Sequence, residues 1–250
     1  MYFTDDCQKP IPVSNHFQWV EVKKVKIEES GEKLLSLNLI PEKFITRPQY
    51  FIQGIEGALP ECFIRESAYD KLLEAAKKLP ERYRFLIYDA WRPEKVQAVL
   101  YQRLKDEVGK KFPGKNEKEI HRLVEEYVAF PSNNRESPSP HLTGGAVDLT
   151  IIDDEGKKLE MGTEFDDTRE EAHSDYYERE EKKRELTEKE KVILQNRRLL
   201  YHTLVHVGFM NYPYEWWHYD FGNQSWAYIA NKKSAFYGVA SPEFRWKHKY

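Results

Sequence analysis

Two short segments of the chain combine residue types that bind a metal ion and move a proton. The first, Ser-Pro-His-Leu-Thr-Gly-Gly-Ala-Val-Asp, spans residues 139–148, and the second, Glu-Trp-Trp-His, spans residues 215–218. Asp148 lies among the apolar residues of a predicted strand, and an unpaired buried carboxylate is costly. A metal ion is one partner that would remove this cost, so the two segments together predict a metal site.

Zinc hydrolases use three protein ligands and leave a fourth position to water. His141, Asp148 and His218 supply two imidazoles and one carboxylate for such a site. Zinc lowers the pKa of water and polarises a scissile carbonyl, and a nearby carboxylate then transfers the proton. Glu215 is the candidate for that role. Residues three apart point to opposite faces of a flat strand, so Glu215 and His218 can serve one site only if the backbone bends between them.

By spacing alone each segment is weak evidence, because an isolated histidine is more often a core or surface residue than a ligand. One further pair, His202 and His206, has the i, i+4 spacing of helical zinc sites. It lacks the glutamate that directly follows the first histidine in that motif. We therefore expect both to be ordinary helix residues.

The elements that must position these residues follow from hydrophobic periodicity and turn signals. Helices are predicted over 65–79, from Pro93 to about 108, over 115–130 and from a Thr187/Glu190 capping box to about 207. Strands are predicted over 19–28, 83–89 and 145–152, with a strand pair over 209–221 and a loop over 131–140. Helices and strands mix without regular βαβ alternation, which favours an α+β fold with a mostly antiparallel central sheet flanked by helices.

Length and composition suit one domain over residues 1–250 with a substantial core. The chain is 14% aromatic and has a formal net charge of -3, which gives no support for a nucleic-acid or anionic-membrane partner. No apolar run reaches the roughly 20 residues of a spanning helix, and the acidic N-terminus is unlike a signal peptide, so we expect a cytoplasmic protein. Cys7 and Cys62 are expected to be unpaired thiols, with a disulfide as the alternative. The charged segment 166–187 is expected to be an exposed excursion.

Taken together and in order, several motifs resemble the D-alanyl-D-alanine dipeptidases, the zinc peptidases that include the vancomycin-resistance dipeptidase. The matching pieces cover most of residues 60–230: Asp-Ala-Trp-Arg-Pro (89–93), the 139–148 segment, Met-Gly-Thr-Glu-Phe-Asp (161–166), Asn-Arg-Arg-Leu-Leu (196–200) and Glu-Trp-Trp-His (215–218). The resemblance implies the fold shared by these dipeptidases and hedgehog-type zinc domains. It also implies a small dipeptide substrate and Zn²⁺ as the cofactor.

The resemblance assigns roles to individual residues. His141, Asp148 and His218 correspond to the zinc ligands, Glu215 to the general base, and Arg92 to the arginine that stabilises the tetrahedral oxyanion. On its own, Arg92 would be interpreted as a surface arginine at the start of a helix. Ser139 corresponds to a residue near the substrate carboxylate. Asp166 corresponds to one near the free amine, with a plain surface charge as its alternative.

The N-terminal segment departs from the family pattern. The family's Tyr-Ala-Thr-x-Asp-Asn-Phe segment, whose tyrosine helps to hold the substrate, has its nearest equivalent at 38–44, where only Phe44 matches. Residues 1–50 are thus poorly covered, and three functions stay open. The first is hydrolysis of D-Ala-D-Ala; the second is another cell-wall peptide hydrolase, such as a D,D- or L,D-carboxypeptidase; the third is a non-catalytic zinc-containing binding module.

Overall fold

The centre of the protein is a mostly antiparallel sheet of five strands, as the sequence predicts. The computed structural model describes residues 9–13, 17–125 and 129–243. The strands lie in the order β3 (Phe44–Thr46), β5 (Arg84–Asp89), β6 (Ala146–Ile152), β8 (His218–Asp220) and β7 (Met210–Asn211). Within this sheet, β3 and β5 form the one parallel pair, and the other neighbouring strands are antiparallel.

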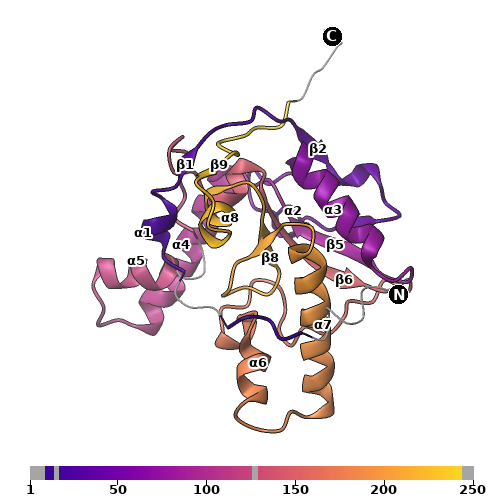
Figure 1. Cartoon of the computed structure of the whole chain (residues 1–250). Coiled ribbons are helices and arrows are strands. Elements are labelled where there is room, and N and C mark those ends of the chain that lie inside the picture. The colour runs from indigo at the N-terminus through magenta and orange to yellow at the C-terminus, as the bar shows by residue number, and fades with distance from the viewer. Residues whose placement is uncertain (1–8, 14–16, 126–128, 244–250) are drawn as a thin grey trace.

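Two small sheets flank the central one. Strands β2 (Leu34–Ser36) and β4 (Phe63–Arg65) pair antiparallel, while β1 (Lys26–Ile27) and β9 (Ser234–Ala235) pair parallel. The second pairing joins an early strand of the chain to its last described strand, in the upper part of Figure 1.

Helices surround the sheet on several sides (Figure 1). The α-helices are α1 (Trp19–Val22), α2 (Gln49–Ile52), α3 (Glu66–Lys78), α4 (Glu94–Lys111), α5 (Glu117–Glu125), α6 (Tyr176–Glu181), α7 (Glu188–Val205) and α8 (Gln224–Ile229). The 3-10 helices are η2 (Leu37–Leu39), η3 (Pro140–Thr143) and η4 (Glu170–Ala172). The capping box predicted at the start of α7 is present, with Thr187 and Glu190 bonded reciprocally.

Successive side chains of β6 point to opposite faces of the sheet, and this separates the core from the site. Val147, Leu149 and Ile151 face the main hydrophobic core, which also contains buried residues of α3 and α7. A fully buried aliphatic side chain contributes about 1.5–3 kcal/mol. Asp148 lies between these positions and therefore points to the opposite face of the sheet. The core thus fixes the strand that carries the central carboxylate.

The predicted strand over 19–28 is wrong for its first half. Trp19 to Val22 form one helical turn, and only Lys26 and Ile27 pair as a strand. The apolar residues at 19 and 22 are three apart, a spacing that suits one face of a helix. Val22 is buried, while Val20 between them is exposed.

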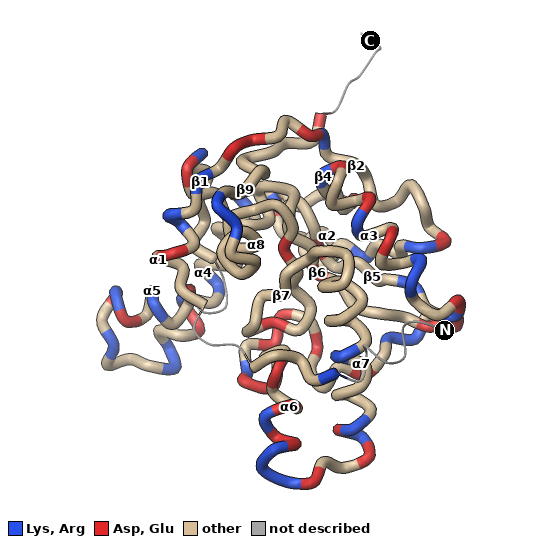
Figure 2. Tube along the Cα trace, in the orientation of Figure 1, with Lys and Arg blue, Asp and Glu red and all other residues tan. Residues whose placement is uncertain are grey.

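Two other predicted segments differ from the structure in extent. Helix α5 is described only from 117 to 125, and residues 126–128 of the predicted helix lie outside the described residues. The segment 166–187 is not simply an exposed excursion, because buried side chains anchor it against α7: Ala172, Ser174, Asp175, Tyr177, Glu178 and Leu186. The solvated charges gather at its tip between α6 and α7 (Figure 2). Charge density alone could not reveal the interleaved buried positions.

Candidate active site

His141, Asp148 and His218 meet where β6 and β8 run side by side. Asp148 and His218 are directly opposite each other in the antiparallel register, and η3 delivers His141 just before β6 begins. One ligand atom from each residue lies within 4.8 Å of the others, and all three side chains are buried. The structure therefore brings together the three residues that the sequence predicts as ligands.

The glycine pair 144–145 makes this approach of η3 to β6 possible. Gly144 has φ 71°, and a Cβ there would overlap the Leu34 side chain. A Cβ on Gly145 would overlap the carbonyl oxygen of Phe221 in the chain after β8. Only glycine fits both positions, so the backbone can turn tightly between His141 and Asp148.

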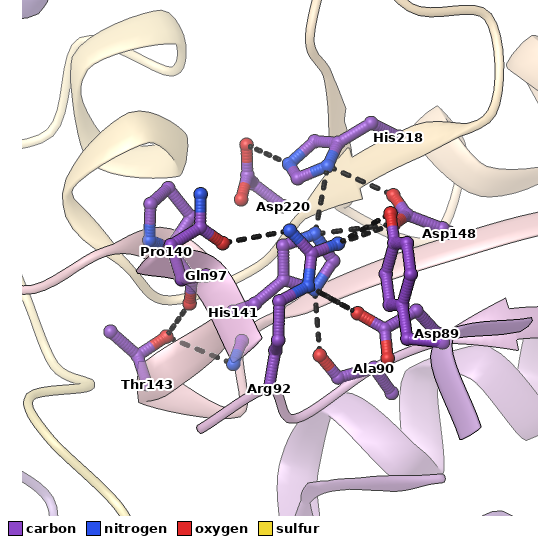
Figure 3. Close-up of polar contacts among 12 residues, drawn as sticks. Asp89, Ala90, Arg92, Gln97, Pro140, His141, Thr143, Asp148, His218 and Asp220 are labelled. Atoms are coloured by element: carbon purple, nitrogen blue, oxygen red, sulfur yellow. Dashed lines mark hydrogen bonds and ion pairs between the residues drawn. The ribbon is translucent and has the colours of Figure 1, made fainter. Parts of the chain in front are cut away.

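Hydrogen bonds determine which ring nitrogens face the centre of the group. His141 Nδ1 lies 2.6 Å from the Ala90 carbonyl oxygen, which only accepts, so Nδ1 carries the proton and Nε2 presents a lone pair. His218 Nε2 lies 3.2 Å from Asp220 Oδ2. His218 Nδ1 faces Asp148 Oδ1 at 3.0 Å and His141 Nε2 at 3.2 Å. Polar atoms of the three residues thus converge on one point (Figure 3), which requires a shared positive charge there, either a proton or a metal ion.

The electrostatics of the group agree with this requirement. Burial opposes a charge on Asp148, yet His141 and then His218 hold its pKa well below the usual range. Burial also opposes a charge on His218, but Asp220 and Asp148 raise its pKa well above the usual range. Two imidazoles and a carboxylate, each oriented by a second partner, fit a tetrahedral zinc site with one open position.

Arg92 lies beside this group at the end of β5. Its Nε donates to Asp89 at 2.7 Å, Nη1 to Gln97 at 2.7 Å and Nη2 to Asp148 at 3.1 Å. The guanidinium also stacks over the Tyr50 ring, with 4.7 Å from Cζ to the ring centroid. These contacts fix a buried positive charge next to the ligand carboxylate (Figure 3), so Arg92 is no free surface arginine.

Glu215 lies in a turn between β7 and β8 rather than on either strand. Its backbone N–H donates to the Tyr212 carbonyl at 3.1 Å, and His218 begins β8 three residues later. This turn provides the bend that the shared site requires. Glu215 Oε2 lies 3.8 Å from His218 Nδ1, and burial raises the pKa of the Glu215 carboxyl to about 8. Glu215 is thus placed and tuned to exchange protons near the ligand group.

Asp166 faces the same cavity from the loop before η4. The residue has φ 64°, an unusual backbone conformation outside glycine, and its Oδ1 accepts a 3.0 Å bond from the Tyr50 hydroxyl. The surrounding protein raises the pKa of Asp166 by desolvation and through Asp148, although Arg92 opposes this. Asp166 is exposed to solvent within the cavity, and this weakens the shift.

The cavity has a volume of about 220 Å³. Both polar and aromatic side chains surround it: Trp19, Tyr50, Arg92, Gln97, His141, Asp148, Asp166, Asp167, Tyr212, Glu215, Trp217 and His218. Ser139 instead lines a neighbouring cavity of about 240 Å³. Its hydroxyl accepts a 2.9 Å bond from the Ser132 N–H and lies 3.1 Å from the Phe130 carbonyl. The structure therefore does not bring Ser139 into the cavity with the other predicted residues.

Sequence reasoning missed Tyr50, Gln97 and Asp220. The sequence contained a signal for Asp220, because it follows His218 by two positions in a predicted strand and therefore lies on the same face. Gln97 follows the Asp-Ala-Trp-Arg-Pro motif on the first turn of α4, but its apolar neighbours gave no sign of a polar partner. Tyr50 had no local signal, since only the packing of α2 beside β5 carries it to Arg92.

The remaining candidates take ordinary places. His202 and His206 lie on α7, where His202 Nε2 is 2.8 Å from the Lys9 carbonyl oxygen. Cys62 is a buried free thiol, and Cys7 lies outside the described residues. In the part of the chain that the structure describes, no helix is long and apolar enough to cross a membrane.

A buried His-Asp-His group that could hold a metal lies beside a buried glutamate of raised pKa and a fixed arginine, a set of groups that metal-dependent hydrolases use. The sequence profile described as D-ala-D-ala dipeptidase matches residues 56–237. The chain belongs to this peptidase family.

Three relatives are each named D-alanyl-D-alanine dipeptidase. That of Synechocystis sp. is 29% identical over 232 residues, covering 86% of this chain and 94% of the relative. That of Escherichia coli K12 is 29% identical over 60% of this chain and 62% of the relative. That of Enterococcus faecalis V583 is 29% identical over 55% of this chain and 61% of the relative.

Proposed function

We propose that this chain is a zinc-dependent dipeptidase that hydrolyses D-alanyl-D-alanine to two D-alanines. The observation that carries the proposal is the meeting of the three ligands, Glu215 and Arg92 around one small cavity. Membership in the dipeptidase family and the names of the three relatives support the choice of substrate.

In the proposed reaction, His141, Asp148 and His218 hold zinc. When bound, zinc supplies a Lewis acid for the scissile carbonyl and lowers the pKa of water. Glu215 accepts the proton of the attacking water and returns it to the leaving amine, which its raised pKa suits. Arg92 lines the cavity, donates through Nη2 to Asp148, and stabilises negative charge as it develops on the carbonyl oxygen.

Asp166 is proposed to bind the free amine of the substrate. Its carboxylate faces the cavity across from the ligands, and Tyr50 holds one of its oxygens. An ammonium paired with this carboxylate would place the first peptide bond near Glu215. A carboxylate at this end also disfavours a substrate whose amine is part of a longer chain, because an amide carries no positive charge. Ser139 is not part of this proposal, since its hydroxyl is engaged in the neighbouring loop.

A dipeptide hydrolysis panel tests the function. The panel contains D-Ala-D-Ala, L-Ala-L-Ala, both mixed-chirality dipeptides and N-acetyl-D-Ala-D-Ala, each with and without a chelator. We expect chelator-sensitive hydrolysis of D-Ala-D-Ala with the highest kcat/KM in the panel. Faster cleavage of the N-acetylated compound would indicate a carboxypeptidase instead. Absence of hydrolysis by the zinc-loaded protein on every compound would indicate a binding module and overturn the proposal.

The variant Glu215→Gln separates chemistry from metal binding. It keeps the shape of the side chain but cannot accept the proton, so zinc content should stay while turnover is lost. Glu170→Gln, an exposed carboxylate paired with Arg179, is the matched control. Full turnover by Glu215→Gln would contradict the role given to Glu215.

A further inference from the structure

The Asn-Arg-Arg segment of α7 contains a buried arginine that the proposed chemistry does not use. Arg197 is 1% exposed, and its guanidinium carbon lies 4.9 Å from the centroid of the Tyr177 ring. A buried guanidinium is costly unless its donors are satisfied. The partners of Arg197 therefore indicate what the side chain is for.

Arg197 donates to three main-chain carbonyl oxygens. Nε bonds Met161 at 2.8 Å, Nη2 bonds Glu171 at 2.6 Å and Nη1 bonds His173 at 2.6 Å. The preceding residue, Asn196, donates to the Glu160 carbonyl at 2.8 Å. One turn of α7 thus holds both ends of the segment from 160 to 173.

The segment held in this way carries Asp166 at its middle. Asp166 has a positive φ, a conformation that persists only where the surrounding structure enforces it. Because both ends of the loop are bonded to α7, the loop cannot relax by shifting either branch. The planar fork of arginine suits this task, since lysine has a single ammonium and cannot reach three separated carbonyls with the same geometry.

The same segment is bonded to the turn that carries Glu215. The Trp216 N–H donates to the Ala172 carbonyl at 3.0 Å, and Trp216 Nε1 donates to Thr163 Oγ1 at 2.8 Å. The Ser174 N–H donates to the Pro213 carbonyl at 3.0 Å. Both branches of the loop therefore contact the 213–216 turn, but β7 and β8 anchor that turn independently on either side, so α7 fixes the loop rather than the turn.

We propose that Arg197 is a positioning residue that fixes the 160–173 loop so that Asp166 meets the free amine of the substrate. The effect on substrate rests on the proposed function, in which Asp166 binds that amine. Arg197 itself does not line the cavity, and its side chain donates to main-chain carbonyls of the loop rather than to the ligands. Its role is therefore separable from zinc binding.

The test compares Arg197→Lys with Arg198→Lys in the full chain. Arg198 is the next residue of α7, but it bonds the carboxylates of Glu178 and Glu181 in the α6 region rather than the loop carbonyls. Three quantities are measured: zinc content, hydrogen exchange of the backbone amides of 161–173 by mass spectrometry, and kcat and KM for D-Ala-D-Ala. Thermal unfolding confirms that each variant is folded.

For Arg197→Lys we expect full zinc content, faster exchange over 161–173 and a higher KM with kcat nearly unchanged. A small displacement of a binding group can cost up to about 100-fold, so a rise in KM of about tenfold or more is expected. Arg198→Lys should change none of these quantities in the loop. Unchanged exchange over 161–173, or a fall in kcat with KM intact, would overturn the proposal.

Two further variants keep the outcomes distinguishable. If Arg197→Lys does not fold, Asn196→Ala removes only the bond to Glu160 at the loop's first end and should still raise exchange there. Asp166→Asn tests the amine contact directly. An unchanged KM in Asp166→Asn together with faster loop exchange in Arg197→Lys would refute the amine contact while keeping the loop clamp. Where Asn196→Ala replaces an unfolded Arg197→Lys, unchanged exchange at the loop's first end would refute the clamp itself.

Discussion

The two walls of the cavity are built in different ways. The metal-side wall is formed by strands β5, β6 and β8 with η3, and two of its ligands, Asp148 and His218, are directly opposite each other in the β6–β8 register. The substrate-side wall is formed by α1, α2 and the 160–173 loop, which contribute Trp19, Tyr50 and Asp166. The first wall is held by the sheet and the core beneath it, and the second by side-chain contacts between separate segments. We infer that the first sets whether the reaction occurs and the second sets which substrate is used.

The largest effect is expected from removing a ligand. His218→Ala should abolish chelator-sensitive turnover, because the remaining His141 and Asp148 leave the zinc site incomplete. Zinc content after gel filtration and hydrolysis of D-Ala-D-Ala measure the outcome. His202→Ala, from the histidine pair on α7, is the matched control and should keep both properties. Full zinc content in His218→Ala would show that the metal-side wall is wrongly assigned.

The second largest effect is expected from replacing the proton-transfer group, Glu215. Glu215→Gln is expected to lower kcat by about 10²–10⁴-fold, the usual contribution of general acid–base catalysis. KM and zinc content should change little, since the side chain keeps its size. Single-turnover kinetics measure the chemical step. A rise in KM without a fall in kcat would move Glu215 from the metal-side wall to the substrate-side wall.

The carboxylate behind His218 should affect metal affinity rather than chemistry. Asp220 lies 3.2 Å from His218 Nε2 and is fully buried. Such outer partners typically change metal affinity by about 10–100-fold. Asp220→Asn should therefore weaken zinc binding in a chelator competition, with Asp154→Asn in an exposed turn as the control. Equal zinc affinity in both variants would show that the His218 imidazole needs no carboxylate partner to bind zinc.

Asp166→Asn should distinguish the two walls most clearly. A hydrogen bond to a charged group contributes about 1.5–3 kcal/mol, and exposure within the cavity favours the lower end, so kcat/KM for D-Ala-D-Ala should fall about tenfold. The loss should be in KM. The N-acetylated dipeptide, which has no ammonium, should be cleaved equally by both proteins. A fall in kcat as large as that of Glu215→Gln would remove the distinction between the walls.

The smallest effect expected is a displacement of the pH profile. Burial raises the pKa of Glu215 to about 8, and the group acts as a base only when deprotonated. Activity should therefore be lost as pH falls through this pKa. Bound zinc adds positive charge and lowers the pKa from that value, so the acid limb of kcat/KM should lie between the ordinary carboxyl range and 8. An acid limb at the ordinary pKa of an exposed glutamate would contradict a desolvated base.

The same difference between the metal-side wall and the substrate-side wall explains which residues could be predicted from the sequence. The ligands, Glu215 and Arg92 lie in short motifs, and the resemblance of these motifs in order to the dipeptidase family, rather than their spacing alone, predicted their meeting. The bend at Glu215 was also a requirement of that spacing, and the turn before β8 meets it. The fold class followed from the order of elements.

The substrate-side wall could not be predicted in the same way. Tyr50 reaches Arg92 only because β3 pairs with β5 and brings α2 alongside. Ser139 was assigned by motif position, yet its hydroxyl bonds the 130–132 loop, a contact between distant turns that spacing does not encode. The helical turn at 19–22 needed the surrounding packing to be distinguished from a strand. Long-range pairing decides these positions, and residue patterns describe mainly near neighbours.

The parallel pairing of β1 with β9 has a consequence for the order of assembly during synthesis. Lys26 leaves the ribosome more than 200 residues before its strand partner, Ser234. Contacts between such distant positions form slowly, because a long loop must close first. The ligand strands β6 and β8 are complete before β9 is available. A nascent chain can therefore acquire its metal-binding half while the N-terminal wall containing Trp19 is still undocked, which makes docking of that wall a late step in maturation.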